Sequence, residues 1–81
     1  MTTYNLEPKF ASVLRDIEDE LSYQDVNYLG NNEKPLEVWL LLAVHHLNYA
    51  LEVYAHGTQQ ETRRQVLKAV ACGFRALLTG K

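Results

Sequence analysis

The sequence has little of what small proteins commonly use to reinforce a fold. It is 81 residues long with a single cysteine, Cys72, so no intramolecular disulfide can form. It also lacks the four-ligand spacing of a structural zinc site. A chain of this length buries only about 60% of the surface that its unfolded form exposes, so a lone monomer is marginally stable. We therefore expect oligomerisation to supply stability, and Cys72, in an apolar run, to be a small core residue.

Strong charge, a long apolar run and a leader-like start are missing too. Eight basic and ten acidic residues give a formal charge of −2, which provides no field for nucleic acid. The longest apolar run is VWLLLAV, residues 38–44, far short of the roughly 20 residues that a membrane span needs. The opening MTTYNLEPKF has neither the basic start nor the apolar core of a signal peptide. These absences predict a cytoplasmic protein that binds neither nucleic acid nor a membrane.

What is present is helical periodicity in three segments. In the first, from about residue 8 to residue 28, apolar residues recur at helical spacing: Phe10, Val13, Leu14, Ile17 and Leu21. The stretch LGNNEKP, residues 29–35, favours a loop. A second helix is predicted from Pro35 or Leu36 to Gly57, where glycine could take a left-handed C-terminal conformation.

The third helix is predicted to begin at once, because Thr58 and Glu61 form a T-x-x-E capping box. It would close at Gly80 and direct a set of large apolar residues inward: Val66, Leu67, Val70, Phe74, Leu77 and Leu78. The short turn requires the second and third helices to form an antiparallel hairpin. The predicted fold is therefore all-α, one domain over residues 1–81, with residues 1–9 left open between ordered and flexible.

The second helix is apolar on nearly all sides. One stripe contains Trp39, Leu42, His46, Tyr49, Ala50 and Val53, and another contains Leu40, Val44, Leu47 and Leu51. The polar strip is narrow, with Glu37, His45, Asn48, Glu52 and His56, and Leu41 interrupts it. Two other helices can hardly cover such a helix. We expect a second copy to pack on it, as a two-fold homodimer whose halves complete a helical bundle.

Three stretches resemble the MazG-like, all-α nucleotide pyrophosphohydrolases. IEDELSYQDVNYLG, residues 17–30, is similar to that family's opening I-x-x-E-R-x-x-Q-D helix, with Leu21 in place of the arginine. PLEVWLLLAVHHLNYALEVY falls where the family has W-L-x-L-L-x-E-E-x-G-E-x-A-x-A, and ETRRQVLKAVACGFRALL resembles its later E-L-x-D helix. The matching residues of the first stretch are Ile17, Glu20, Gln24, Asp25, Tyr28 and Gly30.

The resemblance implies a metal site that this chain has lost. In the family, E-E-x-x-E and E-x-x-D acids hold Mg²⁺, a hard cation that requires oxygen ligands. Here the five positions are His45, His46, Tyr49, Gln65 and Lys68, without one carboxylate. Lys68 would repel the ion. We therefore predict no cofactor and no metal at these positions.

The two histidines allow other interpretations. His45, Tyr49, Glu52 and His56 could bind a transition metal, since imidazole suits Zn²⁺, Ni²⁺ or Cu²⁺. We favour a simpler one, in which His46 is buried and hydrogen-bonded to a neighbour, within the chain or across a dimer interface, and His45 is solvated. A third interpretation is a dimer made pH-sensitive by a buried histidine.

A basic cluster and the aromatic residues are further candidates. Arg63, Arg64 and Lys68 could form an anion site that replaces Mg²⁺ with fixed positive charge. The alternative, which we favour, is a solvated face paired with Glu61 or with the acidic residues 18–20. The aromatic residues could line a base pocket or, as we favour, belong to the core: Tyr23, Tyr28, Trp39, Tyr49 and Tyr54.

The favoured function is a non-catalytic MazG-like protein with a regulatory, binding or interaction role and a cleft for a nucleotide or phosphate. One alternative is an active pyrophosphohydrolase that draws its ligands from Glu18, Glu20 and Asp25. Another is an unrelated helical adaptor or structural module that uses its apolar run only for assembly.

Overall fold

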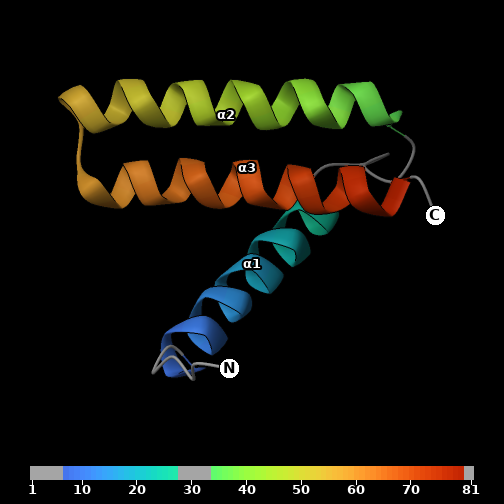
Figure 1. The fold of residues 1–81 in the computed structure, drawn as a ribbon, viewed down its shortest axis with the longest axis horizontal. Coiled ribbons are helices and arrows are strands. Elements are labelled where there is room, and N and C mark those ends of the chain that lie inside the picture. Colours follow the sequence, from blue (N-terminus) through green and yellow to red (C-terminus); the bar gives the residue numbers. More distant parts are fainter. Residues whose placement is uncertain (1–6, 28–33, 80–81) are drawn as a thin grey trace, which may run out of the picture.

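Three α-helices make up the computed structural model, which describes residues 7–27 and 34–79 (Figure 1). They are α1 (Glu7–Asn27), α2 (Leu36–His56) and α3 (Gln59–Thr79). Within these two ranges there is no strand, so the predicted all-α class is confirmed. The first helix begins at Glu7, one residue before the prediction. Residues 1–6, Tyr28, most of the predicted loop and Gly80 lie outside the described residues.

Helices α2 and α3 form the predicted antiparallel hairpin (Figure 1). Its core is small, because Trp39, Cys72 and Ala76 are buried together, with Leu42 and Ala43 packed against them. Other buried positions in the two helices are also mostly small: Ala50, Val53, Ala69 and Ala71. Trp39 supplies the bulk of this core, and the short side chains around it let the two helices pack closely.

The predicted inward face of α3 is wrong. Val66, Val70, Phe74, Leu77 and Leu78 are 39–73% exposed, and only Leu67 of the predicted set is half-buried. The positions that face the rest of the chain carry alanine, cysteine and Arg75 instead. Sequence periodicity marks the face with the largest apolar residues, whereas the close approach of α2 selects the face with the smallest.

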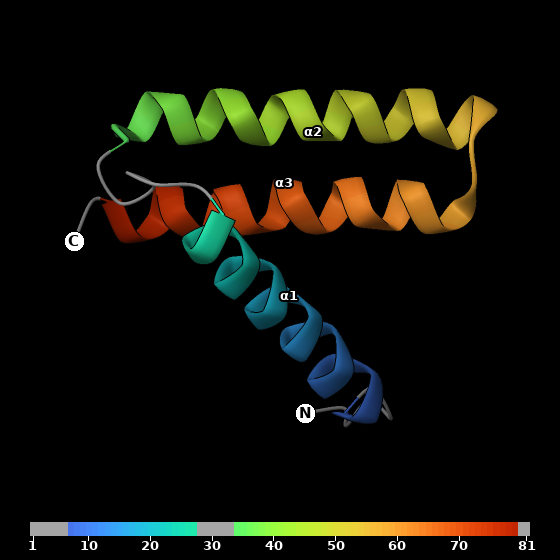
Figure 2. The ribbon, with the colours of Figure 1, turned by 180° about the vertical axis from the view of Figure 1, so that it is seen from behind.

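Helix α1 contacts the hairpin over residues 16–25, from the ion pair of Asp16 with Arg63 to that of Asp25 with Arg75. Ile17 is buried and Leu21 half-buried, but Phe10, Val13 and Leu14 are exposed because the N-terminal half projects away from α3 (Figures 1 and 2). The radius of gyration is 14.0 Å, against about 12 Å for a compact domain of this length. The single chain is therefore an open arrangement rather than a closed bundle.

The turn between α2 and α3 depends on glycine for a different reason than predicted. Gly57 has φ −111° and ψ −157°, an extended conformation and not the left-handed one. A Cβ atom at this position would lie 2.8 Å from Val53 Cγ1 and 3.0 Å from the Val53 carbonyl oxygen. The Gly57 N–H donates to that same carbonyl. Glycine is needed because the chain passes too close to the end of α2 for a side chain.

Thr58 caps α3 as predicted. The Glu61 N–H donates to Thr58 Oγ1 at 3.1 Å, and Thr62 Oγ1 donates to the Thr58 carbonyl oxygen at 3.0 Å. This satisfies one of the N–H groups that a helix start leaves without a partner. Over the described residues, none of the three helices is both long and apolar enough to cross a membrane.

Removing the cap should weaken the hairpin. We expect Thr58→Ala to lower the free energy of unfolding by about 1 kcal/mol, because the Glu61 N–H loses its acceptor. Urea denaturation followed by circular dichroism measures the difference. Thr58→Ser keeps the hydroxyl and should stay close to the wild type, so equal losses in both variants would contradict the capping role.

Candidate functional site

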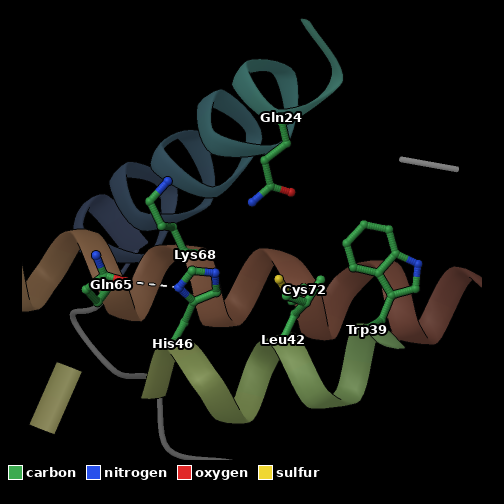
Figure 3. A pocket seen from close by; sticks show the side chains of 7 residues that line it. All are labelled: Gln24, Trp39, Leu42, His46, Gln65, Lys68 and Cys72. Atoms are coloured by element: carbon green, nitrogen blue, oxygen red, sulfur yellow. Dashed lines mark hydrogen bonds between the residues drawn. The ribbon is translucent and has the colours of Figure 1, made fainter. Parts of the chain in front are cut away.

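A pocket of about 290 Å³ lies where the three helices meet (Figure 3). Helix α1 contributes an amide, α2 contributes an aromatic ring, a leucine and an imidazole, and α3 contributes an amide, an ammonium and a thiol. The complete lining is Gln24, Trp39, Leu42, His46, Gln65, Lys68 and Cys72. The lining combines the apolar side chains of Trp39, Leu42 and Cys72 with imidazole, amide and ammonium groups, and such a mixture is typical of small-molecule sites.

His46 and Gln65 are joined directly across the hairpin. His46 Nδ1 lies 3.0 Å from Gln65 Oε1 (Figure 3). An amide oxygen can only accept, so with the amide in this orientation Nδ1 carries the proton and Nε2 is left as an acceptor. His46 is half-buried. This agrees with the interpretation of His46 as an imidazole bonded to a neighbour, and the neighbour belongs to the same chain.

Lys68 points toward α1, where a carboxylate meets it. Lys68 Nζ lies 3.6 Å from Glu20 Oε2, and the two side chains are only 19% and 13% exposed. Gln24 Nε2 also donates to Glu20 Oε2, at 2.9 Å, and the ring of Tyr23 lies 5.4 Å from Lys68 Nζ. The positive charge at the pocket is thus balanced by one carboxylate of α1.

Arg75 is the polar residue that the sequence reading missed. It is 7% exposed, and its Nε donates to Gln24 Oε1 at 3.1 Å. One Nη donates to the Leu21 carbonyl oxygen at 3.0 Å and to Asp25 Oδ1 at 2.8 Å. The guanidinium carbon lies 5.5 Å from the centre of the Trp39 ring. A signal was present, since Arg75 interrupts an apolar run beside Cys72 and Ala76, on the face that packs inward.

The five positions that the resemblance assigns to metal ligands are not brought together as a set. His46, Gln65 and Lys68 line the pocket, whereas His45 and Tyr49 are exposed and lie outside it. The His45 and His46 rings still meet edge to face, 5.1 Å apart. Adjacent residues of a helix point in directions about 100° apart, so His45 cannot share the pocket with His46.

The alternative transition-metal set is also divided. Tyr49, Glu52 and His56 line a second hollow of about 310 Å³ near the turn, without His45. Across the parts of the chain that the structure describes, no three His, Cys, Asp or Glu side chains are grouped so that they could hold a metal ion.

The basic cluster is divided between two places. Lys68 lines the pocket, whereas Arg63 and Arg64 line another hollow near the start of α3. Arg63 forms an ion pair with Asp16, and Lys68 pairs with Glu20. Pairing with acidic residues of α1 was the favoured interpretation, although Asp16 was not among the expected partners.

The carboxylates proposed for an enzyme with ligands on α1 do not form an open cluster. Glu20 is paired with Lys68 and Asp25 with Arg75, while Glu18 is exposed. Two of the three carboxylates therefore pair with cations of α3, and this pairing competes with metal binding.

Among the aromatic residues that the structure describes, only Trp39 belongs to the core. Tyr23, Tyr49 and Tyr54 are exposed, so the interpretation of these tyrosines as core residues is wrong, and Tyr28 lies outside the described residues. Cys72 is buried, as expected. Burial raises the pKa of its thiol, opposed by the nearby charge of Arg75, so the group stays protonated and poorly nucleophilic.

Comparison of the chain with protein-family models, curated proteins and solved structures finds no match. The resemblance to the MazG-like pyrophosphohydrolases is therefore carried by the sequence motifs alone.

The attachment of α1 should depend on Arg75. Arg75→Met keeps the length of the side chain but leaves the buried Gln24 oxygen and the Leu21 carbonyl without their donor, and we expect it to cost about 2 kcal/mol of unfolding free energy. Urea denaturation gives the loss, and amide hydrogen exchange should show it concentrated in α1.

Arg64→Met is the matched control, because Arg64 lies on the same helix and is exposed. It should change stability by less than about 0.5 kcal/mol. Equal effects of the two substitutions would contradict the role of Arg75.

Proposed function

We propose that this chain is a non-catalytic, MazG-like homodimer of the cytoplasm that binds a small polar or phosphate-bearing molecule in the pocket between its helices, in a regulatory or interaction role. The observation that supports this most directly is the pocket itself. At positions where the resemblance expects magnesium ligands, it presents His46, Gln65 and Lys68, with one hydrogen bond already formed between two of them.

The chemistry of this lining suits an anion better than a metal ion. Mg²⁺ requires several oxygen ligands in octahedral geometry and negative charge around it. Here the nearest carboxylate, that of Glu20, already faces Lys68 Nζ at 3.6 Å and Gln24 Nε2 at 2.9 Å. The Gln65 amide nitrogen and the Lys68 ammonium offer donors instead, which phosphate oxygens accept readily.

The Lys68–Glu20 pair leaves room for such a ligand. At 3.6 Å it is a long contact, and a lysine side chain can turn its ammonium toward a phosphate without losing its neighbour. The pocket volume of about 290 Å³ is near the lower end of the range for small-molecule sites. A ligand the size of a nucleotide base or a phosphate group fits that space.

Apolar surface that is exposed in the single chain supports the homodimer. The second stripe of α2, with Leu40, Val44, Leu47 and Leu51, is 49–70% exposed in the single chain. The accessible surface is 6590 Å², whereas a folded monomer of this mass exposes about 5,000 Å². A second copy could remove the excess from water.

The first test is release of pyrophosphate from a panel of nucleoside triphosphates, with Mg²⁺, Mn²⁺ and Zn²⁺ added separately to the folded protein. We expect no release above the background, and we expect calorimetry to show no stoichiometric Mg²⁺ site of micromolar affinity. Calorimetry with the same triphosphates should show binding that Lys68→Ala weakens and Arg64→Ala leaves unchanged.

Metal-dependent release would instead support an active pyrophosphohydrolase with ligands on α1. Neither release nor binding would favour the adaptor, whose partner is another protein.

The family resemblance has its own test. A variant that restores acids at the three positions that line the pocket, with His46→Glu, Gln65→Glu and Lys68→Asp, should bind Mg²⁺ if these positions correspond to those of the family. Calorimetry measures the gain, and circular dichroism confirms that the variant is still helical. A folded variant that binds no Mg²⁺ would argue against the relationship.

A further inference from the structure

The α2–α3 hairpin has two faces of different character. On one face α1 crosses α3, and there the pocket forms, with Leu42 and His46 on α2 and Lys68 and Arg75 on α3 turned toward α1. The end of α1 passes in front of α3 in Figure 2 and behind it in Figure 1. The opposite flanks of both helices therefore lie on a face that α1 does not cover.

We call the side of the hairpin that α1 does not cover the open face. It is apolar on both helices. On α2 the residues opposite Leu42 include Leu40, Val44 and Leu47, and on α3 those opposite Arg75 include Val66, Val70 and Leu77. All six are exposed. The antiparallel course of the hairpin puts the two rows side by side. These are large apolar residues that nothing in the described chain covers.

A glycine within this face has no explanation inside the chain. Gly73 lies in the interior of α3, where glycine is less favourable than alanine. A Cβ atom added there would have nothing within 4 Å. Along the axis of α3 it lies between Val70 and Leu77, and around the axis it lies at the edge of the α3 row, next to the buried Ala69 and Ala76. The fold of one chain does not need a glycine at this place, whereas the close approach of a second backbone would.

We propose that a second copy of this chain docks on the open face, with the two hairpins packed face to face as a four-helix core and with Gly73 at the point where a partner helix approaches most closely. The proposal rests on the homodimer of the proposed function and assigns its surface. Helix α1 and the pocket then lie on the outer sides of the dimer, so each pocket remains accessible to its ligand.

The exposed area favours a second copy as the occupant. The chain exposes 6590 Å², which exceeds the area expected of a folded monomer of this mass by about 1,600 Å². The open face contributes to this excess together with the projecting half of α1. A standard interface buries about 800 Å² per partner, and permanent homodimers bury more. An apolar face is also self-complementary under two-fold symmetry, because it sets no like charges against each other.

Sedimentation equilibrium on Gly73→Ala tests the close approach. Alanine favours the helix and has open space in the single chain, so the variant should keep its helix content. A methyl group in a tight helix contact should nevertheless raise the dimer dissociation constant by about tenfold or more. A dissociation constant equal to or lower than that of the wild type would overturn the role of Gly73.

Two leucines of α2 provide a matched pair for the face itself. Leu47 lies on the open face and Leu41 on the polar strip, and they are 49% and 68% exposed in the single chain. Leu47→Glu should give monomers, because it would bury an unpaired charge in the interface, whereas Leu41→Glu should remain dimeric. If Leu47→Glu fails to fold, Gly73→Ala decides the question.

A wild-type protein that sediments as a monomer at micromolar concentration would overturn the proposal, and so would dimers that survive Leu47→Glu. Binding of triphosphates is measured separately by calorimetry. Loss of ligand binding with an intact dimer would contradict the proposed function while leaving this interface in place.

Discussion

The buried guanidinium of Arg75 is the interaction on which the placement of α1 depends. It joins α3 to three groups of α1, namely the Gln24 side chain, the Leu21 carbonyl and the Asp25 carboxylate, while its central carbon lies 5.5 Å from the centre of the Trp39 ring. A buried charge of this kind is tolerated only when its donors are satisfied. The angle and register of α1 are therefore fixed by hydrogen bonds of defined direction, whereas apolar contact alone would allow α1 to slide.

The same network reaches the pocket. Gln24 accepts from Arg75 with its oxygen and donates to Glu20 with its nitrogen, and Glu20 in turn meets Lys68. The wall that α1 gives to the pocket is thus held by a chain of polar contacts along α3. Such networks are rigid when every member has its partner. Lys68 supplies positive charge to the pocket and is also the last member of this network. The charge of the pocket and the position of its wall therefore depend on the same residue.

Helical periodicity was enough to predict the three helices, the hairpin and the cap at Thr58, because these depend on local spacing and on a short turn. The inward face of α3 could not be predicted in the same way. The helix carries one row of large apolar residues and one row of small ones, and the distance to α2 decides which of them is buried. At the site, His46 and Gln65, two of the five positions taken from the resemblance, lie within hydrogen-bond distance. The sequence pattern could not show that His45 points elsewhere or that Arg75 turns inward to meet Asp25.

The turn through Gly57 and Thr58 also has a consequence for the order of folding. The hairpin closes between neighbouring segments, whereas the contacts of Arg75 join residues about 50 positions apart in the chain. Closing the longer loop costs more entropy, so local contacts form sooner. We expect the hairpin to assemble early and α1 to dock on it late. Before α1 docks, both faces of the hairpin are exposed to solvent. A nascent chain in a crowded cell is then most susceptible to non-native association.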